Sequence, residues 1–358
     1  MLALRRIFTD STPQVRHKVT GMYIILLSAN AILWAITVYY SIRFPFLLPI
    51  AFAAYGFGLK HAVDADHIAA IDNVTRKLMQ EKKQPVTVGL FFSLGHSSVV
   101  VIMSVLVAAG VSFIRKGLVN GSSNLLTVFG LIGTSISAIF LIVIGVINLV
   151  ILFQALNAFK YAAAGNPIGD DIDEYLNKRG FFARIFRGLF KSIDKSWKMY
   201  PVGFLFGLGF DTASEIAILT VSGSLATQSI PFYVVLLFPL LFTAGMSLID
   251  TTDGILMLGA YGWAFMKPIR KLYYNVSITT ISVFVAFVIG GIETISVISG
   301  LLNLHGGVWD VVNGVSFGKV GISIVIILLL SWAISSIIYR AKKYDDIELS
   351  ATQAGTPE

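Results

Sequence analysis

Long apolar stretches alternate with short polar connections along nearly the whole chain. Each stretch has at least about 20 residues, the length that an α-helix needs to cross about 30 Å of hydrocarbon. Lipid offers no hydrogen-bond partners to backbone N–H and C=O groups, so such stretches are expected to be helical. The sequence lacks the alternating pattern of a membrane β-barrel. The sequence therefore predicts an all-α polytopic membrane protein with eight transmembrane helices, at 19–41, 46–72, 86–112, 126–157, 201–222, 231–262, 272–300 and 318–339.

Charge supports this prediction and orients the chain. Only 13% of the 358 residues are charged, about half the share of a typical soluble domain. Of the 27 Lys and Arg residues, 22 lie before the first stretch, in alternate connections or after the last stretch, and only 4 in the other connections. The positive-inside rule then predicts a multi-pass protein of the cell (cytoplasmic or inner) membrane with both termini in the cytoplasm. The stretch after Arg5-Arg6 is too long for a signal-peptide core, so we expect it to be retained.

A long middle connection divides the chain into two halves. We expect a transmembrane half at 1–157, a cytoplasmic loop at 158–199, a second transmembrane half at 200–340 and a cytoplasmic tail at 341–358. Within the loop, residues 181–191 combine aromatic and basic residues at helical spacing. This pattern indicates an amphipathic helix, lying either on the lipid surface or on the protein's own cytoplasmic face.

Short segments recur between the halves. Phe57-Gly58-Leu59 returns as Phe206-Gly207-Leu208 after 149 residues, and Gly95 with Ser97 returns as Gly245 with Ser247 after 150. The second and fifth stretches cross the membrane in opposite directions in this topology. The recurrence therefore favours an inverted-topology repeat, with a substrate site between the halves near the midplane.

The second stretch carries an unusual run of ionisable residues, from Lys60 to His67. A charged side chain at the bilayer centre costs about 3 kcal/mol, so such groups pair, face water or bind an ion. Imidazole beside carboxylate is a typical ligand set for a metal ion. For Lys60, Asp253 and Glu293, the alternative to metal binding is an ion pair with a neighbouring residue or a position near the membrane–water interface. For His96, the alternative is a hydrogen-bonded histidine in the protein core. We predict metal ligands at His61, Asp64, Asp66, His67, His96, Asp211, Glu215 and Asp250.

Helical geometry constrains this set. At about 100° per residue, His61 and His67 differ by roughly 120° around one ideal helix, so they cannot both point at one ion. Either the helix is broken, helped by Gly56 and Gly58, or some members only orient the ligands, as carboxylates often do for a ligating His. The chain has no Cys, and a mixed nitrogen and oxygen site suits Ni²⁺ or Co²⁺ without excluding Zn²⁺ or Mn²⁺.

At these residues the sequence resembles the nickel/cobalt transporter (NiCoT) family. The matching segments are 61–68, 94–100, 208–216 and 245–254. The resemblance implies eight helices with cytoplasmic termini, and high-affinity uptake of scarce Ni²⁺ or Co²⁺ for metalloenzymes such as urease or hydrogenase. It also implies that His61, Asp66 and His67 are the most critical residues, with Asp64 beside them. One departure is Lys60, where the family commonly has Arg. In the family, this position is Val or Phe in members with different nickel and cobalt preferences, and the resemblance implies that Val63 favours nickel.

The expected activity is transport rather than catalysis. No Walker-type Gly-x-x-x-x-Gly-Lys-Ser/Thr run exists, so we expect a secondary carrier without an ATPase subunit, catalytic residues or a cofactor. Its partners are the divalent metal ion and the lipid bilayer, and the scattered basic residues give no nucleic-acid surface. A carrier or channel for Zn²⁺ or Mn²⁺ is the alternative. An intramembrane metalloenzyme is remote, because His-Glu-x-x-His is absent and the chain has only five His.

Overall fold

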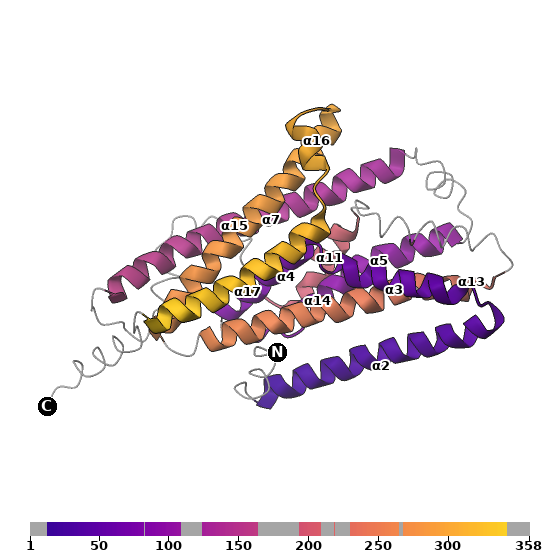
Figure 1. Cartoon of the computed structure of the whole chain (residues 1–358), viewed down its shortest axis with the longest axis horizontal. Coiled ribbons are helices and arrows are strands. Elements are labelled where there is room, and N and C mark those ends of the chain that lie inside the picture. The colour runs from indigo at the N-terminus through magenta and orange to yellow at the C-terminus, as the bar shows by residue number, and fades with distance from the viewer. Residues whose placement is uncertain are drawn as a thin grey trace.

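The computed structural model describes residues 13–81, 83–108, 124–163, 193–208, 218, 230–264 and 268–341. These residues form helices and no strand, as predicted (Figure 1). The helices are α2 (Pro13–Arg43), α3 (Leu47–His61), α4 (Ala65–Gln80), α5 (Val88–Ala108), α7 (Asn124–Ala163), η1 (Ser196–Lys198), α11 (Met199–Gly207), α13 (Phe232–Val235), α14 (Leu237–Ala264), α15 (Pro268–Leu302), α16 (Val308–Asn313) and α17 (Phe317–Ala341).

Five described helical segments are long and apolar enough to cross a membrane. They cover Pro13–Arg43, Val88–Leu106, Leu131–Asn157, Phe232–Gly259 and Thr279–Leu302, which agree with five of the eight predicted stretches. The stretch at 201–222 is described only through residue 208 and at residue 218, and the loop segment 181–191 and residues 342–358 lie outside the described residues. An all-helical protein with several membrane-length helices is therefore confirmed.

The predicted second helix, 46–72, is not continuous. It divides into α3 and α4 at Ala62–Asp64, where Asp64 adopts an extended backbone with φ −69° and ψ 149°. The amide of Asp64 donates to the carbonyl of His61 at 2.9 Å and closes a tight turn between the two helices. Of the two alternatives given above, the broken helix is present in the structure. The break follows His61, however, and Gly56 and Gly58 both lie inside α3.

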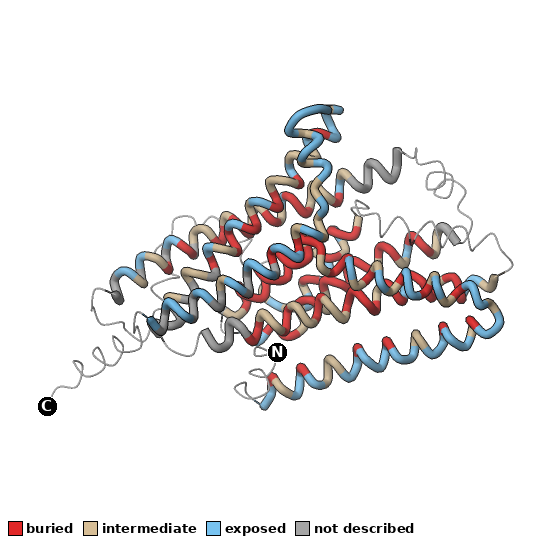
Figure 2. Tube along the Cα trace, viewed as in Figure 1, coloured by how far each residue is buried: buried red, intermediate tan, exposed pale blue. Residues whose placement is uncertain are grey.

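The core is formed around α3, α4, α5, α11 and α14, as the red segments in Figure 2 show. There α14 packs against α3, α5 and α4, while α11 packs against α5, and α7 lies beside α15. The outer helices expose large apolar side chains, such as Ile24 and Ile25 on α2 and Ile322 and Leu330 on α17. Such faces would be unfavourable in water and suit contact with lipid.

The polar helix α4 is an exception to this pattern. Sequence reasoning placed Arg76 and Lys77 in a connection on the cytoplasmic side. Their assignment to a connection was wrong, because both lie within α4 and are only 1% and 2% exposed. Arg76 donates to Thr279 of α15 at 2.7 Å, and Lys77 donates to the carbonyl of Ile193 at 2.7 Å. Both cations therefore have hydrogen-bond partners inside the bundle, and the helix continues beyond the apolar stretch.

Candidate metal centre

Three histidines from three helices meet in the core. His61 ends α3, His67 lies in the first turn of α4, and His96 lies in the middle of α5. Their rings are 4.7 to 4.8 Å apart, centroid to centroid, and one nitrogen from each lies within 4.8 Å of the others. All three side chains are almost completely buried, with exposed fractions of 2%, 0% and 2%. The break between α3 and α4 is what lets two histidines six residues apart face each other.

Two carboxylates stand behind this histidine cluster. Asp64 contacts Nδ1 of His61 at 3.0 Å, and Asp250 of α14 contacts Nδ1 of His67 at 3.3 Å. Asp64 is the N-cap residue of α4, yet its side chain makes no capping bond and binds the imidazole instead. A carboxylate on one ring nitrogen fixes the tautomer and makes the other nitrogen a better metal ligand. Each aspartate thus contacts the Nδ1 atom of one imidazole.

The opposite ring nitrogens face one another. Nε2 of His61 and Nε2 of His96 are 2.9 Å apart. Two nitrogens that each bind one divalent ion at about 2.1 Å are about 3 Å apart when they bind at right angles. Nε2 of His67 is buried and has no hydrogen-bond partner among the described residues, although a buried polar atom normally has one. The cluster thus offers an all-imidazole face to a borderline transition-metal ion.

The surroundings of the cluster are apolar and tightly packed. The ring of Phe92 lies edge-on to His67 at 4.8 Å, and the ring of Phe242 lies 5.6 Å from His61. Late in the chain, α17 packs against the turn between α3 and α4. A Cβ at Gly318 would lie 3.1 Å from Oδ1 of Asp64, and one at Gly321 would overlap the carbonyl oxygen of Val63. The last helix therefore holds the turn that carries Asp64.

The remaining predicted residues are distributed differently. Asp66, beside His67, is partly exposed and outside the histidine cluster, while Asp211 and Glu215 lie outside the described residues. Lys60 is exposed and Asp253 is partly exposed. Glu293 is buried, and it accepts a hydrogen bond from Ser137 of α7 at 2.9 Å.

Sequence reasoning missed a polar network that follows the cluster along α4. Oδ2 of Asp72 accepts a hydrogen bond from Ser282 of α15 at 2.7 Å, and the side chain of Asn73 accepts from Asn148 of α7. Both α4 residues are buried, with exposed fractions of 3% and 0%. The signal was the polar run Asp72-Asn73 directly after an apolar helical turn, which we assigned to the end of a span.

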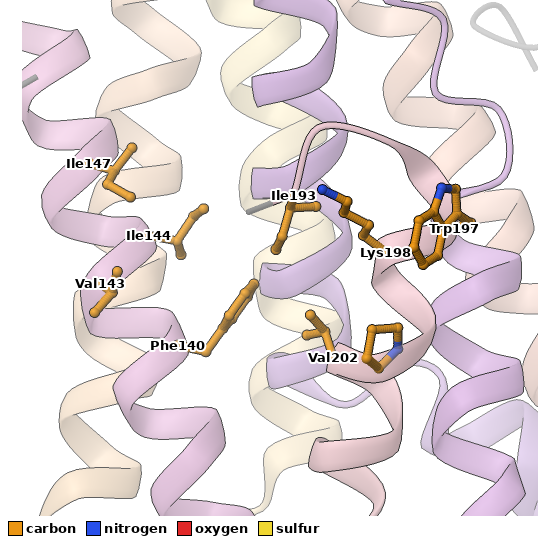
Figure 3. Close-up of a pocket in the computed structure, with 9 residues that line it drawn as sticks. Phe140, Val143, Ile144, Ile147, Ile193, Trp197, Lys198 and Val202 are labelled. Atoms are coloured by element: carbon orange, nitrogen blue, oxygen red, sulfur yellow. The ribbon is translucent and has the colours of Figure 1, made fainter. Parts of the chain in front are cut away.

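An apolar pocket of about 400 Å³ lies apart from the histidines. It is formed by α7 and by residues 193–202, and Figure 3 shows Phe140 and Ile144 on one side with Ile193, Trp197 and Val202 on the other. Lys198, at its edge, pairs with Asp194 at 2.7 Å, and this hydrogen bond holds the pKa of the Asp194 carboxyl below its usual value. The described residues that line this pocket include no His, Asp or Glu, so it is separate from the histidine cluster.

Comparison with known proteins places these features in one family. A family described as high-affinity nickel-transport protein matches residues 47–338. The chain is 48% identical to the high-affinity nickel transport protein of Cupriavidus necator, over 96% of this chain and 97% of that protein. It is 45% identical to the nickel transporter NicT of Mycobacterium tuberculosis, over 84% and 81% of the two chains. It is 40% identical to the cobalt transport protein NhlF of Rhodococcus rhodochrous, over 69% and 70%.

No solved structure matches the chain. The family match spans most of the chain, including α3, α4, α5 and α14, which carry the histidine cluster and its carboxylates. Together with the membrane-length helices, it makes this a multi-pass membrane transport protein. The chain belongs to the family of high-affinity nickel-transport proteins.

Proposed function

We propose that the chain is a secondary transporter that takes up Ni²⁺, and with it Co²⁺, across the cytoplasmic membrane. The observation that carries the proposal is the meeting of three buried imidazoles from three helices. A pore for hydrated ions would be wide and lined with water, whereas this cluster is small, buried and surrounded by Phe92 and Phe242. A dehydrated borderline cation is the substrate that such nitrogen ligands suit best.

The proposed ligands differ in their roles. His61, His67 and His96 bind the ion, while Asp64 and Asp250 hold two of the rings and balance charge. Asp66 remains a candidate ligand next to His67. Asp211 and Glu215 also remain candidates, on the segment that follows α11. Three imidazoles leave room on an octahedral ion for oxygen ligands from such carboxylates or from water.

The proposal includes eight transmembrane helices, with both termini in the cytoplasm, arranged as an inverted repeat. Packing supports the repeat. A Cβ at Gly58 of α3 would overlap the backbone of α14, and one at the related Gly207 of α11 would lie 2.6 Å from the His96 carbonyl oxygen of α5. The second related pair is also closely packed. A Cβ at Gly245 would lie 2.8 Å from the carbonyl oxygen of Tyr55, and one at Gly95 would overlap the carbonyl oxygen of Tyr200 and lie 2.8 Å from the amide nitrogen of Phe204.

The second pair exchanges partners as a two-fold axis would require, because Gly245 and Gly95 are 150 positions apart and their partners Tyr55 and Phe204 are 149 apart. In the first pair Gly58 and Gly207 are 149 positions apart, whereas their partners Phe242 and His96 are 146 apart, about one helical turn away from that register. The metal centre lies where the contacts of α3 with α14 and of α11 with α5 meet, because His61 ends α3 and His96 lies on α5. Rocking of one half against the other would then expose the ion to each side in turn.

The membrane potential supplies enough energy for uptake. One charge that crosses 100 mV gains about 2.3 kcal/mol, so a divalent cation gains about 4.6 kcal/mol. That corresponds to an accumulation of roughly a thousandfold without a second ion. No ATPase subunit is required by this scheme.

Uptake of ⁶³Ni²⁺ into proteoliposomes tests the proposal. Purified protein should take up the ion when a negative-inside potential is imposed with valinomycin and K⁺, and the uptake should saturate. A His67→Ala variant should remove saturable uptake, while Asp310→Asn, a change on the exposed surface of α16, should not. Wild-type protein that shows no uptake above empty vesicles would refute the proposal.

Competition by other ions separates the alternatives. We expect excess Co²⁺ to inhibit ⁶³Ni²⁺ uptake more strongly than Zn²⁺ or Mn²⁺ does. Stronger inhibition by Zn²⁺ or Mn²⁺, with transport of those ions, would favour the alternative carrier. Uptake that rises linearly with concentration and never saturates would favour a channel.

A further inference from the structure

The apolar pocket described above lies on a seam between two pairs of packed helices. One wall belongs to α7, which packs against α15, and the other wall belongs to residues 193–202, where α11 begins and packs against α5. Figure 3 shows the α7 side chains across an open space from Ile193, Trp197 and Val202. The side chains of the two walls leave a volume of about 400 Å³ between them.

This pocket has a buried back and an exposed edge. Ile144 and Ile147 of α7 are only 5% and 3% exposed, whereas Trp197 on the other wall is 52% exposed. Apart from Lys198 and the indole N–H of Trp197, the lining side chains are hydrocarbon. Water finds no hydrogen-bond partners in such a space, whereas a hydrocarbon chain is stabilised by each CH₂ group that it buries there. The α7 wall extends from Phe140 to Ile147, about 10 Å along the helix.

The two walls place the pocket between the lipid tails and the headgroups. Its α7 wall lies within the membrane-length segment Leu131–Asn157, where lipid tails surround the protein. Its other wall begins at Ile193, in the middle connection that the distribution of basic residues places in the cytoplasm. Trp197 belongs to this second wall, and Trp is enriched where headgroups meet hydrocarbon. A lipid of the cytoplasmic leaflet can thus extend one tail into the pocket.

The charged side chains near Ile193 carry a net positive charge. Lys77 donates to the Ile193 carbonyl and lies 3.7 Å from Glu81. Lys198 pairs with Asp194 at 2.7 Å, yet an ammonium group has three donors, and 27% of this side chain remains exposed. The full set is four lysines and two carboxylates, which leaves a charge of +2: Lys77, Glu81, Lys83, Asp194, Lys195 and Lys198.

We propose that the apolar pocket binds one acyl chain of an anionic phospholipid, with the lipid phosphate on Lys195 and Lys198. The inference rests on the proposed topology for the cytoplasmic side, and it does not depend on nickel transport. Basic pockets between transmembrane helices on that side are known to suit anionic headgroups. A phosphate that accepts from lysine forms a charge-assisted hydrogen bond, and this favours an anionic lipid over a zwitterionic one.

The bound lipid has a structural consequence. Helix α7 belongs to the first half of the chain and α11 to the second, so the acyl chain lies where the two halves face each other without filling the space themselves. It therefore supplies part of the packing between the halves.

Native mass spectrometry of the delipidated, full-length protein in detergent tests the proposal. The protein is mixed with phosphatidylglycerol or with phosphatidylcholine that has the same acyl chains. The wild type should retain one phosphatidylglycerol, at least about fivefold more than phosphatidylcholine. Val143→Phe, which fills the pocket, should lower this retention at least about fivefold. Ile139→Phe is the matched control, because Ile139 is 64% exposed on the same helix and does not line the pocket, and it should bind as the wild type does.

The headgroup is tested separately. The double variant Lys195→Gln/Lys198→Gln should retain phosphatidylglycerol only as well as phosphatidylcholine. Glycerol 3-phosphate, which has the headgroup phosphate without acyl chains, should not displace the lipid.

Three results would overturn the inference. Wild-type retention in Val143→Phe would show that the lipid binds elsewhere on the apolar surface. Equal retention of the two lipids by the wild type would exclude the lysine–phosphate contact. No retained lipid in the wild type would show that the pocket has another occupant, such as residues 181–191. If Val143→Phe is not monodisperse, Val202→Phe on the opposite wall replaces it, and the lysine variant decides if both fail. Nickel enters none of these measurements, so failure of the transport proposal is distinguishable.

Discussion

A single methyl group at Gly207 should disturb the metal centre from outside it. Gly207 ends α11 and lies against α5, where a Cβ would be 2.6 Å from the carbonyl oxygen of His96 and 3.1 Å from its Cα. Ordinary contact begins at about 3.4 Å, so Gly207→Ala requires the helices to separate by about 0.8 Å. Because both neighbours are backbone atoms, no side-chain rotation can relieve the clash.

The consequences for binding and stability differ in size. His96 and His61 are 2.9 Å apart at Nε2, and a ligand site tolerates displacements of only about 0.5 Å. We therefore expect nickel affinity to fall about 10- to 100-fold. Overpacking lowers the free energy of unfolding by about 1–3 kcal/mol, while the higher helix propensity of Ala over Gly raises it by up to about 1 kcal/mol. The protein should thus remain folded, with a slightly lower Tm.

Equilibrium ⁶³Ni²⁺ binding by the purified protein measures the effect. Gly56→Ala is the matched control, because Gly56 lies within α3 and a Cβ there would have nothing within 4 Å. This control should bind nickel as the wild type does. Wild-type affinity in Gly207→Ala would show that the crossing of α11 and α5 does not position His96, and the reasoning would be refuted.

Three further predictions address the carboxylates and the topology. Asp250→Asn should weaken nickel binding about 10- to 100-fold, because the imidazole of His67 loses the carboxylate that orients it. Nickel-binding isotherms measure this effect, and an unchanged isotherm would show that Asp250 does not orient His67 for metal binding. Ser137→Ala should lower the free energy of unfolding by about 1–3 kcal/mol, because the buried Glu293 loses a hydrogen-bond donor, and it should leave nickel affinity unchanged. Thermal unfolding and nickel-binding measurements on the same protein check both effects, and a loss of nickel binding would contradict the prediction. Since the chain has no Cys, single variants Lys83→Cys and His305→Cys can be labelled from one side of intact cells: an impermeant maleimide should reach position 305 and not 83, and the reverse pattern would contradict the orientation.

Much of this architecture could be predicted from the chain alone, because lipid imposes long apolar helices and the histidines stand inside them. The run from His61 to His67 identified the site. Periodicity could not reveal the packing around the break in the second helix. The turn at Ala62–Asp64 contacts α17, which is about 250 residues later and approaches Val63 and Asp64 through Gly318 and Gly321. Tertiary packing of this kind leaves no local pattern in the sequence.

The polar part of α4 shows a second limit. The charges of Arg76 and Lys77 indicated a loop, yet Thr279 and the carbonyl of Ile193 accept hydrogen bonds from them inside the bundle. Conversely, the pairing of His67 with Asp250 joins residues 183 positions apart, and only the fold brings them together. Residue types predicted the chemistry of the site, whereas the division between rings that face each other and carboxylates that stand behind them required coordinates.

X-ray absorption at the nickel K-edge of the metal-loaded protein tests the central claim most directly. The histidine cluster predicts the multiple-scattering signature of about three imidazoles with nickel–nitrogen distances near 2.1 Å, falling by one imidazole in His96→Ala. A spectrum of oxygen ligands without imidazole scattering, unchanged in that variant, would show that the ion is bound elsewhere.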